Sequence, residues 1–151
     1  MAETIEYKVM MVRRDIPELK KLLNDLDGSL MEAHAEYMSD LLDKGQPANL
    51  IYINDQSMCV AFTKDMEVVG FITVNPQIET QSIITEHVFV RKKWRKQGVY
   101  KLMMKRVEKF AKDIGAKNII SFVWLGNDLS KKVHQRIGFK KKIIGYIQEV
   151  K

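Results

Sequence analysis

A run of apolar residues in the middle of the chain leads into a strongly basic loop. Val88-Phe89-Val90 is followed by five cationic residues within six positions, and Gly98 then opens an amphipathic helix. Backbone N–H groups at a helix start have no intrahelical acceptor, and the helix dipole adds a positive potential there. The pattern therefore favours a phosphate-binding site, although a solvated basic loop would explain the same residues.

The elements that would position this loop follow from hydrophobic periodicity. The sequence predicts strands over 4–12, 57–63, 67–74, 82–91, 118–124 and 139–150, and helices over 17–26, 29–42, 98–114 and 128–138. Gly28 is expected to separate the first two helices, and Asn75-Pro76 to end the third strand. The order β-α-α-β-β-β-α-β-α-β predicts an α/β fold, a mixed sheet with helices on both faces. The unit 82–124 should be a right-handed parallel crossover.

Length and composition limit the class of protein further. The chain has 151 residues, of which 46% are hydrophobic, enough for one core and too many for a disordered chain. We expect a single domain over residues 1–151, without a signal peptide or a membrane-spanning run. The single cysteine, Cys59, cannot form a disulfide within the chain, which fits a cytoplasmic location.

Charge is distributed unevenly along the chain. Residues 1–90 carry 7 Lys and Arg against 15 Asp and Glu, whereas residues 91–151 carry 18 against 4. This asymmetry suggests that the second half faces an anion and that the first half attracts a cation. A phosphorylated cofactor, a nucleic acid or a membrane surface could each be the anion.

Three motifs together resemble the GNAT superfamily of acyl-CoA-dependent N-acyltransferases. The family signature Gln/Arg-x-x-Gly-x-Gly/Ala is similar to Arg95-Lys96-Gln97-Gly98-Val99-Tyr100, and the hydrophobic pair before it is similar to Val88-Phe89-Val90. A later family pattern, Asn-x-x-Ala-x-x-Leu/Phe-Tyr-x-Lys/Arg-x-Gly-Phe, resembles residues 127–139. The sequence departs from the family at Tyr100, where Gly or Ala is usual, and at His134, where Tyr is usual.

The resemblance implies a GNAT-like fold with a mostly antiparallel central sheet and one parallel pair, 82–91 and 118–124, which splays apart to hold acetyl-CoA as co-substrate. It implies that the pantetheine arm lies along the strand before the loop and the pyrophosphate on the loop itself. The implied cofactor-binding residues are Val88, Phe89, Val90, Arg95, Lys96, Gln97, Gly98, Val99, Tyr100, Asn127 and Ser130. It also implies direct attack by an amine on the thioester, with no acyl-enzyme.

The attacking amine must lose a proton, so a base is needed. Glu86 is the candidate, because it shares its parity with Val88 and Val90 and because the resemblance implies a catalytic glutamate at this position, two residues before the hydrophobic pair. An ordinary solvent-facing strand glutamate would explain the residue as well. His87 should point to the other face unless a bulge intervenes, and is the reserve base. His134 is the candidate acid for the leaving thiolate, and an exposed helix histidine explains it as well.

Other residue types point away from metal or covalent chemistry. The three histidines have no metal-ligand spacing, so no metal is expected. Cys59 is expected to be a core thiol rather than an acyl carrier. His34 lies in the segment that lines the acceptor site in the resembled family, where it would pack or contact substrate.

The acceptor and the partners stay open. The acidic first half, with Asp25, Asp27, Glu32, Glu36, Asp40 and Asp43, favours a cationic amine on a small molecule or a protein. An alternative is a catalytically inactive domain that binds acyl-CoA or nucleic acid, the second of which we favour less because no nucleic-acid-binding signature is present. No membrane partner is expected, and a homodimer could complete the sheet edge.

Overall fold

The computed structural model describes residues 7–13, 16–45, 57–121 and 128–140, except the side chains of 128–130. The chain divides into two compact units, one up to Ser121 and one from Phe122 onward. Each unit is described by itself. Most of the predicted site lies in the first unit.

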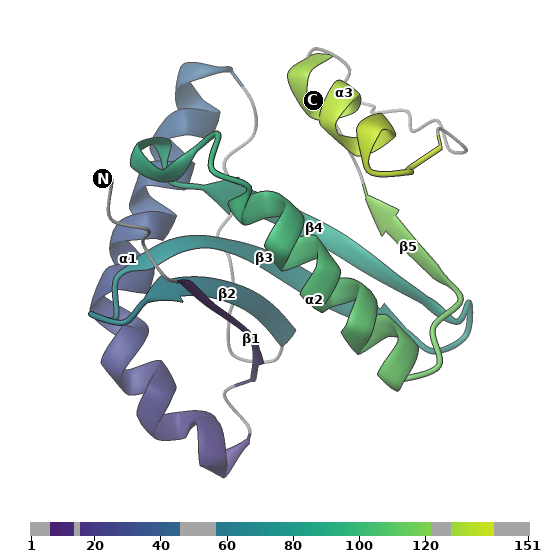
Figure 1. Cartoon of the computed structure of the whole chain (residues 1–151), viewed down its shortest axis with the longest axis horizontal. Helices are drawn as coiled ribbons and strands as arrows, with labels where there is room; N and C mark the ends of the chain where they lie inside the picture. The colour runs from purple at the N-terminus through teal and green to yellow at the C-terminus, as the bar shows by residue number, and fades with distance from the viewer. Residues whose placement is uncertain (1–6, 14–15, 46–56, 122–127, 141–151) are drawn as a thin grey trace, which may run out of the picture. The chain divides into compact units, whose positions relative to one another are not determined.

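The first unit is built on a five-stranded sheet in the order β1-β2-β3-β4-β5 (Figure 1). Neighbouring strands are antiparallel from β1 to β4, and β4 and β5 are parallel. The sequence prediction of a mixed α/β fold with one parallel pair is confirmed. The strands are β1 (Tyr7–Val12), β2 (Ser57–Thr63), β3 (Val68–Gln77), β4 (Ser82–Val90) and β5 (Asn118–Ser121).

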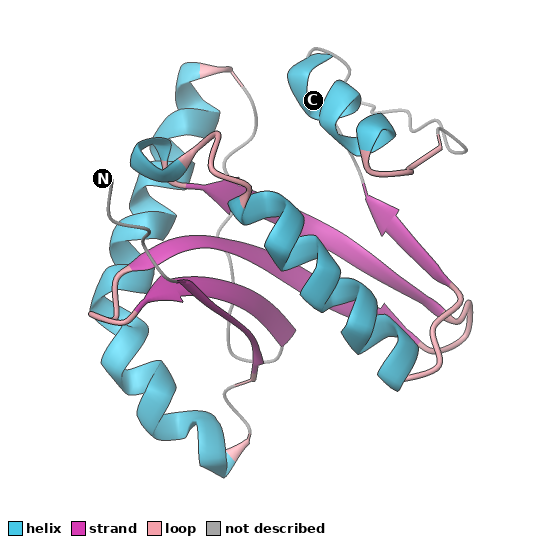
Figure 2. Ribbon diagram, in the orientation of Figure 1, coloured by secondary structure: helices cyan, strands magenta, loops and turns pink. Residues whose placement is uncertain are grey.

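Helices cover both faces of this sheet (Figure 2). The long helix α1 (Lys20–Asp43), preceded by the short 3-10 helix η1 (Pro17–Leu19), packs on one face. The helix α2 (Val99–Asp113) packs on the other face and follows the 3-10 helix η2 (Lys92–Trp94). The face toward α1 forms a continuous apolar core in which Leu26 and Phe71 are almost fully buried. In the described residues no helix is long and apolar enough to span a membrane.

The prediction of two helices before β2 is wrong, because α1 continues through Gly28 without a break. The buried side chains keep one helical period across the glycine: Leu23, Leu26, Leu30, Ala33, Tyr37 and Leu41. Burial of this stripe outweighs the cost of one glycine in a helix, which is about 1 kcal/mol. Tertiary packing therefore decides the conformation at Gly28.

Gly28→Ala should stabilise the protein by about 0.5–1 kcal/mol, because Ala restricts the unfolded chain and has a higher helix propensity. A Cβ at Gly28 would meet no heavy atom within 4 Å, so no steric term opposes the gain. Urea unfolding of both proteins measures the difference. A lower midpoint for the variant would contradict the prediction.

Two predicted strand ends also differ from the structure. β3 runs through Asn75 and Pro76 to Gln77, although Asn75-Pro76 was expected to end it. Pro76 lies opposite Ile83 of β4, one residue before the end of β3. The described part of β5 is partly exposed, not buried on both faces as predicted. The rest of the predicted strand, 122–124, lies outside the described residues.

The second unit contains the helix α3 (Asp128–Arg136). Inside this unit the ring of His134 lies 5.1 Å from the ring of Phe139, in an edge-on arrangement. Phe139 and Lys140 follow the helix without strand structure. The remainder of the predicted strand 139–150 lies outside the described residues.

Candidate active site

One edge of β4 carries main-chain groups without a strand partner in the described residues. The parallel pairing with β5 reaches only Thr85 opposite Ser121, whereas β4 continues to Val90. On the other edge Arg91 N–H donates to Val69 at 2.9 Å. Antiparallel bonding alternates, so the N–H and C=O groups of Val88 and Val90 face the β5 side. An extended ligand could bond to this edge as an additional strand would.

β4 has a bulge where the two candidate bases lie. Ile72 is opposite Val88, but Val74 is opposite Thr85, so Glu86 and His87 together oppose Thr73. The main-chain N–H of His87 donates to Thr73 Oγ1 at 2.9 Å instead of to a carbonyl. The extra residue shifts the alternation of side chains along β4.

The bulge places both candidate bases on the α1 face of the sheet. His87 contacts Tyr37 of α1, and Glu86 Oε1 accepts a hydrogen bond from Asn75 Nδ2 at 3.1 Å. Asn75 is two positions from Thr73 on β3 and shares its face. The parity assigned to Glu86, the same as Val88 and Val90, is therefore wrong, because the bulge lies between them.

His87 is held in a small group of rings. Its Nδ1 lies 3.0 Å from the Tyr37 hydroxyl, and the Tyr37 ring also packs against Phe71 and Phe89. Burial lowers the pKa of His87; Glu86 partly offsets this, and His34 adds to it. Burial and the nearby Asp40 raise the pKa of Tyr37 to about 12. At neutral pH the pair is therefore an uncharged phenol beside a largely neutral imidazole.

Stability should fall as the pH is lowered below about 6.5, the ordinary pKa of histidine. The folded state holds His87 with a lowered pKa, so the unfolded chain binds more protons at this residue. Acidification therefore stabilises the unfolded chain relative to the folded state. Urea unfolding at pH 7 and pH 5 measures the loss. His87→Asn, which does not titrate, should lose less stability between these pH values than the parent protein; an equal loss would contradict this origin.

The turn between η2 and α2 presents main-chain donors. Lys96 and Gly98 both have left-handed backbone conformations, with φ of 62° and 80°. The N–H groups of Lys96, Gln97 and Gly98 have no acceptor among the described residues. The helix α2 follows at once, and its Leu102 N–H donates to the Gly98 carbonyl at 3.1 Å. The N–H groups of residues 96–98 form an anion-binding surface.

The side chains of this turn are largely engaged by the protein. Gln97 Oε1 accepts from the Tyr7 hydroxyl at 2.7 Å. Arg95 Nε donates to the Val90 carbonyl at 2.8 Å, and its guanidinium lies 5.3 Å from the Phe89 ring centre. Gln97 can therefore bind an anion chiefly through its main-chain N–H group. Arg95 caps one of the two carbonyl groups on the open edge of β4.

The other predicted cofactor residues have distinct environments. Phe89 and Val99 are buried, so only their main-chain atoms can reach a ligand. Tyr100 is half-buried, and burial raises the pKa of its hydroxyl to about 12. Asn127 lies outside the described residues, and the side chain of Ser130 is not described. His134 belongs to the second unit, whose position relative to β4 is not defined.

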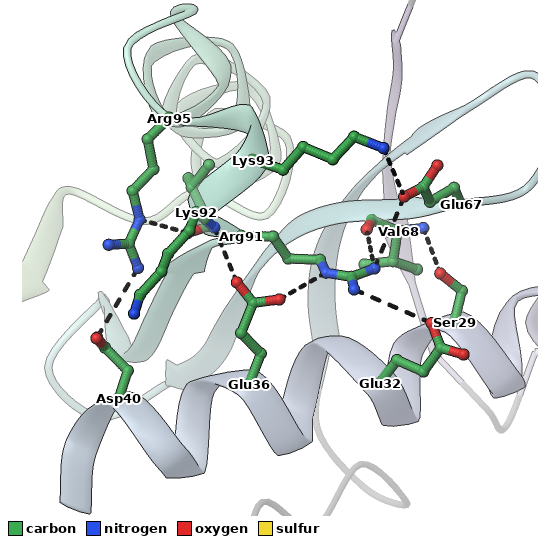
Figure 3. Close-up of polar contacts among 11 residues, drawn as sticks. Ser29, Glu32, Glu36, Asp40, Glu67, Val68, Arg91, Lys92, Lys93 and Arg95 are labelled. Atoms are coloured by element: carbon green, nitrogen blue, oxygen red, sulfur yellow. Dashed lines mark hydrogen bonds and ion pairs between the residues drawn. The ribbon is translucent and has the colours of Figure 1, made fainter. Parts of the chain in front are cut away.

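Two carboxylates on one face of α1 form ion pairs with the basic loop. Glu36 Oε2 lies 2.9 Å from Arg91 Nε, and Asp40 lies 3.8 Å from the Arg95 guanidinium (Figure 3). The charge asymmetry of the sequence is thus partly neutralised inside the first unit. In this region the negative charge of α1 is therefore weaker support for a cationic acceptor than the sequence alone suggested.

Sequence reasoning missed the roles of Tyr37 and Glu36, which contact the predicted site from α1. Glu36 is separated from Arg91 by 55 positions and Tyr37 from His87 by 50. The available signal was weak: Glu32, Glu36 and Asp40 recur at a spacing of four on one helix face, opposite in charge to the loop. In the described ranges no three His, Cys, Asp or Glu side chains group in a way that could hold a metal ion.

Among the described residues, the edge of β4 beyond Thr85 has no strand partner and precedes an amide-rich turn, an arrangement that suits an elongated acyl donor with phosphate groups. The model of the acetyltransferase (GNAT) family matches residues 19–139. The chain therefore belongs to the GNAT acetyltransferase family and is an acetyl-CoA-dependent N-acetyltransferase. An aminoglycoside N(6')-acetyltransferase type 1 from Acinetobacter genomosp. 13 is 27% identical over 108 residues, which cover 72% of this chain and 73% of the relative.

Solved structures show the same fold at lower identity. The aminoglycoside N-acetyltransferase AAC(6')-Iy in complex with CoA has a TM-score of 0.64 and 19% identity, covering 99% of both chains. The same enzyme is known with a bisubstrate analogue that contains CoA and acetylneamine. The ribosomal-protein-alanine N-acetyltransferase of Brucella melitensis biovar Abortus 2308 has a TM-score of 0.70 and 14% identity, covering 96% of this chain and all of the other.

Proposed function

We propose that the protein transfers the acetyl group of acetyl-CoA directly to a primary amine of a small molecule, with both substrates bound together. The edge of β4 beyond Thr85 carries this proposal, because it has no strand partner in the described part of the chain and is followed, after η2, by a turn in which Lys96, Gln97 and Gly98 have no described acceptor for their amides. We propose that residues 1–151 act as one domain, since the family model spans both compact units.

The residues of the first unit fit coenzyme A. An elongated amide-containing arm suits the N–H and C=O groups of Val88 and the N–H of Val90, whereas the Val90 carbonyl is taken by Arg95. A diphosphate suits the turn at 96–98. Lys92, Lys93 and Lys96 are exposed and add attraction for an anion. When bound, acetyl-CoA supplies an activated thioester. An N–H on the open edge of β4 would stabilise negative charge that develops on the carbonyl oxygen.

Removal of the amine proton is assigned to side chains at the bulge. Glu86 is exposed on the α1 face, where an amine can reach it from solvent, and it serves as the base. His87, half-buried beside it, is the alternative base. We assign His134 as the acid for the thiolate, and Asn127 and Ser130 as further contacts to the cofactor. These last three assignments rest on the resemblance of residues 127–139 to the family pattern, which has the same residue at Asn127 but Ala and Tyr at the positions of Ser130 and His134.

No cysteine intermediate is required, which gives a further prediction. Cys59 is fully buried, its Sγ lies 3.6 Å from the Met103 carbonyl, and burial raises the pKa of the thiol to about 12. A thiol in this state is neither accessible nor ionised, so it is a poor nucleophile. Cys59→Ala should keep turnover within about threefold of the parent while it loses stability from a small cavity. A kinetic assay and urea unfolding check both; a 100-fold loss of turnover would favour a covalent role.

The acceptor class is proposed from the relatives and from the exposed carboxylate at the bulge. Aminoglycosides are polycationic small amines, and one relative carries that substrate in its name. An exposed Glu86 on the α1 face would attract such a cation. Aminoglycosides and linear polyamines are therefore the first acceptors to test, with N-terminal peptides as the comparison.

Thiol release from acetyl-CoA, measured with this panel of amines, tests the proposed function. We expect release that depends on both substrates, with intersecting initial-rate lines, and saturation by one class of small cationic amine. Parallel lines would contradict direct attack, since they indicate an acyl-enzyme. If CoA raises the melting temperature but no amine releases thiol, a binding domain without catalysis replaces the proposal.

A further inference from the structure

A network of charged side chains connects α1 to the segment that precedes the anion-binding turn (Figure 3). Glu36 of α1 lies at its centre: Oε1 accepts from the main-chain N–H of Lys92 at 2.9 Å, and Oε2 accepts from Arg91 Nε at 2.9 Å. One carboxylate thus holds the main chain and a side chain of consecutive residues. Its two oxygens serve two different donors.

The same network fixes the start of β3. Arg91 Nη1 donates to the Val68 carbonyl at 3.3 Å, and the Val68 N–H donates to Ser29 Oγ on α1 at 2.7 Å. Burial alone would raise the pKa of Glu36, but the hydrogen bonds from Lys92 and Arg91 outweigh it and hold the pKa below its ordinary value. Glu36 therefore remains charged at neutral pH and keeps both bonds.

Glu36 acts at the first residue of η2, which leads directly into the turn. Arg91 is the residue before η2, and it has no side-chain cap of its own. The Glu36 carboxylate takes over the capping role from another helix. At the other end of η2, Trp94 is buried and its ring meets Tyr7 edge-on, 5.7 Å away. The segment before Lys96 is thus held at both ends.

We propose that Glu36 is the positioning residue for the diphosphate-binding turn: by holding Arg91 and Lys92, it sets where the amides of residues 96–98 point. This inference rests on the proposed function, because it assumes that coenzyme A binds at that turn. It adds that α1, the helix that also carries Tyr37 beside the candidate bases, controls cofactor affinity. Glu36 itself touches no substrate in this proposal.

The test compares two ligands that differ in the diphosphate. CoA contains it, whereas pantetheine lacks both the diphosphate and the nucleotide. In Glu36→Gln an NH2 group replaces one of the two oxygens that accept from Lys92 and Arg91, so one of these two donors would face another donor. We expect the Kd for CoA, from calorimetry, to rise about tenfold, and the Kd for pantetheine, from an NMR titration, to stay unchanged.

Glu32→Gln is the matched control, because Glu32 lies on the same helix but only 4.0 Å from Arg91 and is 72% exposed. It should change neither constant. Arg91→Lys keeps the positive charge but loses the guanidinium group, which donates to both Glu36 and the Val68 carbonyl, so this variant should also bind CoA more weakly. It provides the test if Glu36→Gln does not fold. An equal loss for CoA and pantetheine, or no loss of CoA affinity, would overturn the inference. A parent protein that binds no CoA would instead reject the proposed function.

Discussion

Glu86→Gln should lower kcat about 10²- to 10⁴-fold, the usual contribution of a positioned general base. Gln has nearly the same shape and can still accept from Asn75 Nδ2, so the local structure should persist. It cannot take the proton that the acceptor's ammonium group must lose before the amine attacks the thioester. The Kd for CoA should not change, because Glu86 lies on the α1 face and not at the 96–98 turn. Steady-state kinetics and calorimetry separate the two effects.

Two further variants serve as the control and as the test of the alternative base. Glu79→Gln changes an exposed glutamate in the turn between β3 and β4, and it should leave turnover at the parent level. His87→Gln removes the alternative base from the same bulge. If His87→Gln lowers kcat by two orders of magnitude while Glu86→Gln does not, the base is His87 and the assignment of Glu86 is wrong.

The bulge explains why the sequence could not decide between these two residues. Alternation along a strand assigns Glu86 and His87 to opposite faces, and that rule holds only while the two strands advance together. The extra residue in β4 becomes evident only from the pairing with β3, where Val88 lies opposite Ile72 and Thr85 lies opposite Val74. No residue type in β4 alone indicates it. Both side chains therefore reach the α1 face, a result that only the pairing reveals.

Local patterns predicted the local parts of the fold well. The bounds of β2 were predicted as the structure has them, and the helix after Gly98 begins one residue later at Val99. Prediction failed where distant residues decide. Gly28 stays helical because the stripe on both sides of it is buried against the sheet. The long-range pairing of Glu36 with Arg91 has no local signature.

The basic loop shows the same division between local and distant information. Its unpaired amides follow from the sequence, since a glycine at a helix start leaves the first N–H groups exposed. The positions of the cationic side chains of this loop do not follow from the sequence. Arg91 and Arg95 turn toward carboxylates of α1, whereas Lys92 and Lys96 stay exposed. The sequence prediction treated all four as equivalent charges that face an anion.

Gly98→Val should weaken CoA binding about 10- to 100-fold. Gly98 has a φ of 80°, a left-handed conformation that costs an L-residue roughly 1–2 kcal/mol and a β-branched residue more. Relief of that strain would rotate the main chain of the turn and misdirect its N–H groups. A charge-assisted hydrogen bond to an anion contributes roughly 1.5–3 kcal/mol, so loss of one suffices for the predicted change.

Gly115→Val separates this effect from a general loss of stability. Gly115 has nearly the same φ, 77°, and lies just beyond the other end of α2. An added Cβ meets no atom within 4 Å at either glycine, so strain alone should lower the melting temperature of both variants by similar amounts. Only Gly98→Val should lose affinity for CoA in calorimetry. Equal affinities for the two variants would mean that the amides of this turn do not hold the diphosphate, because the same backbone strain was applied at both ends of one helix.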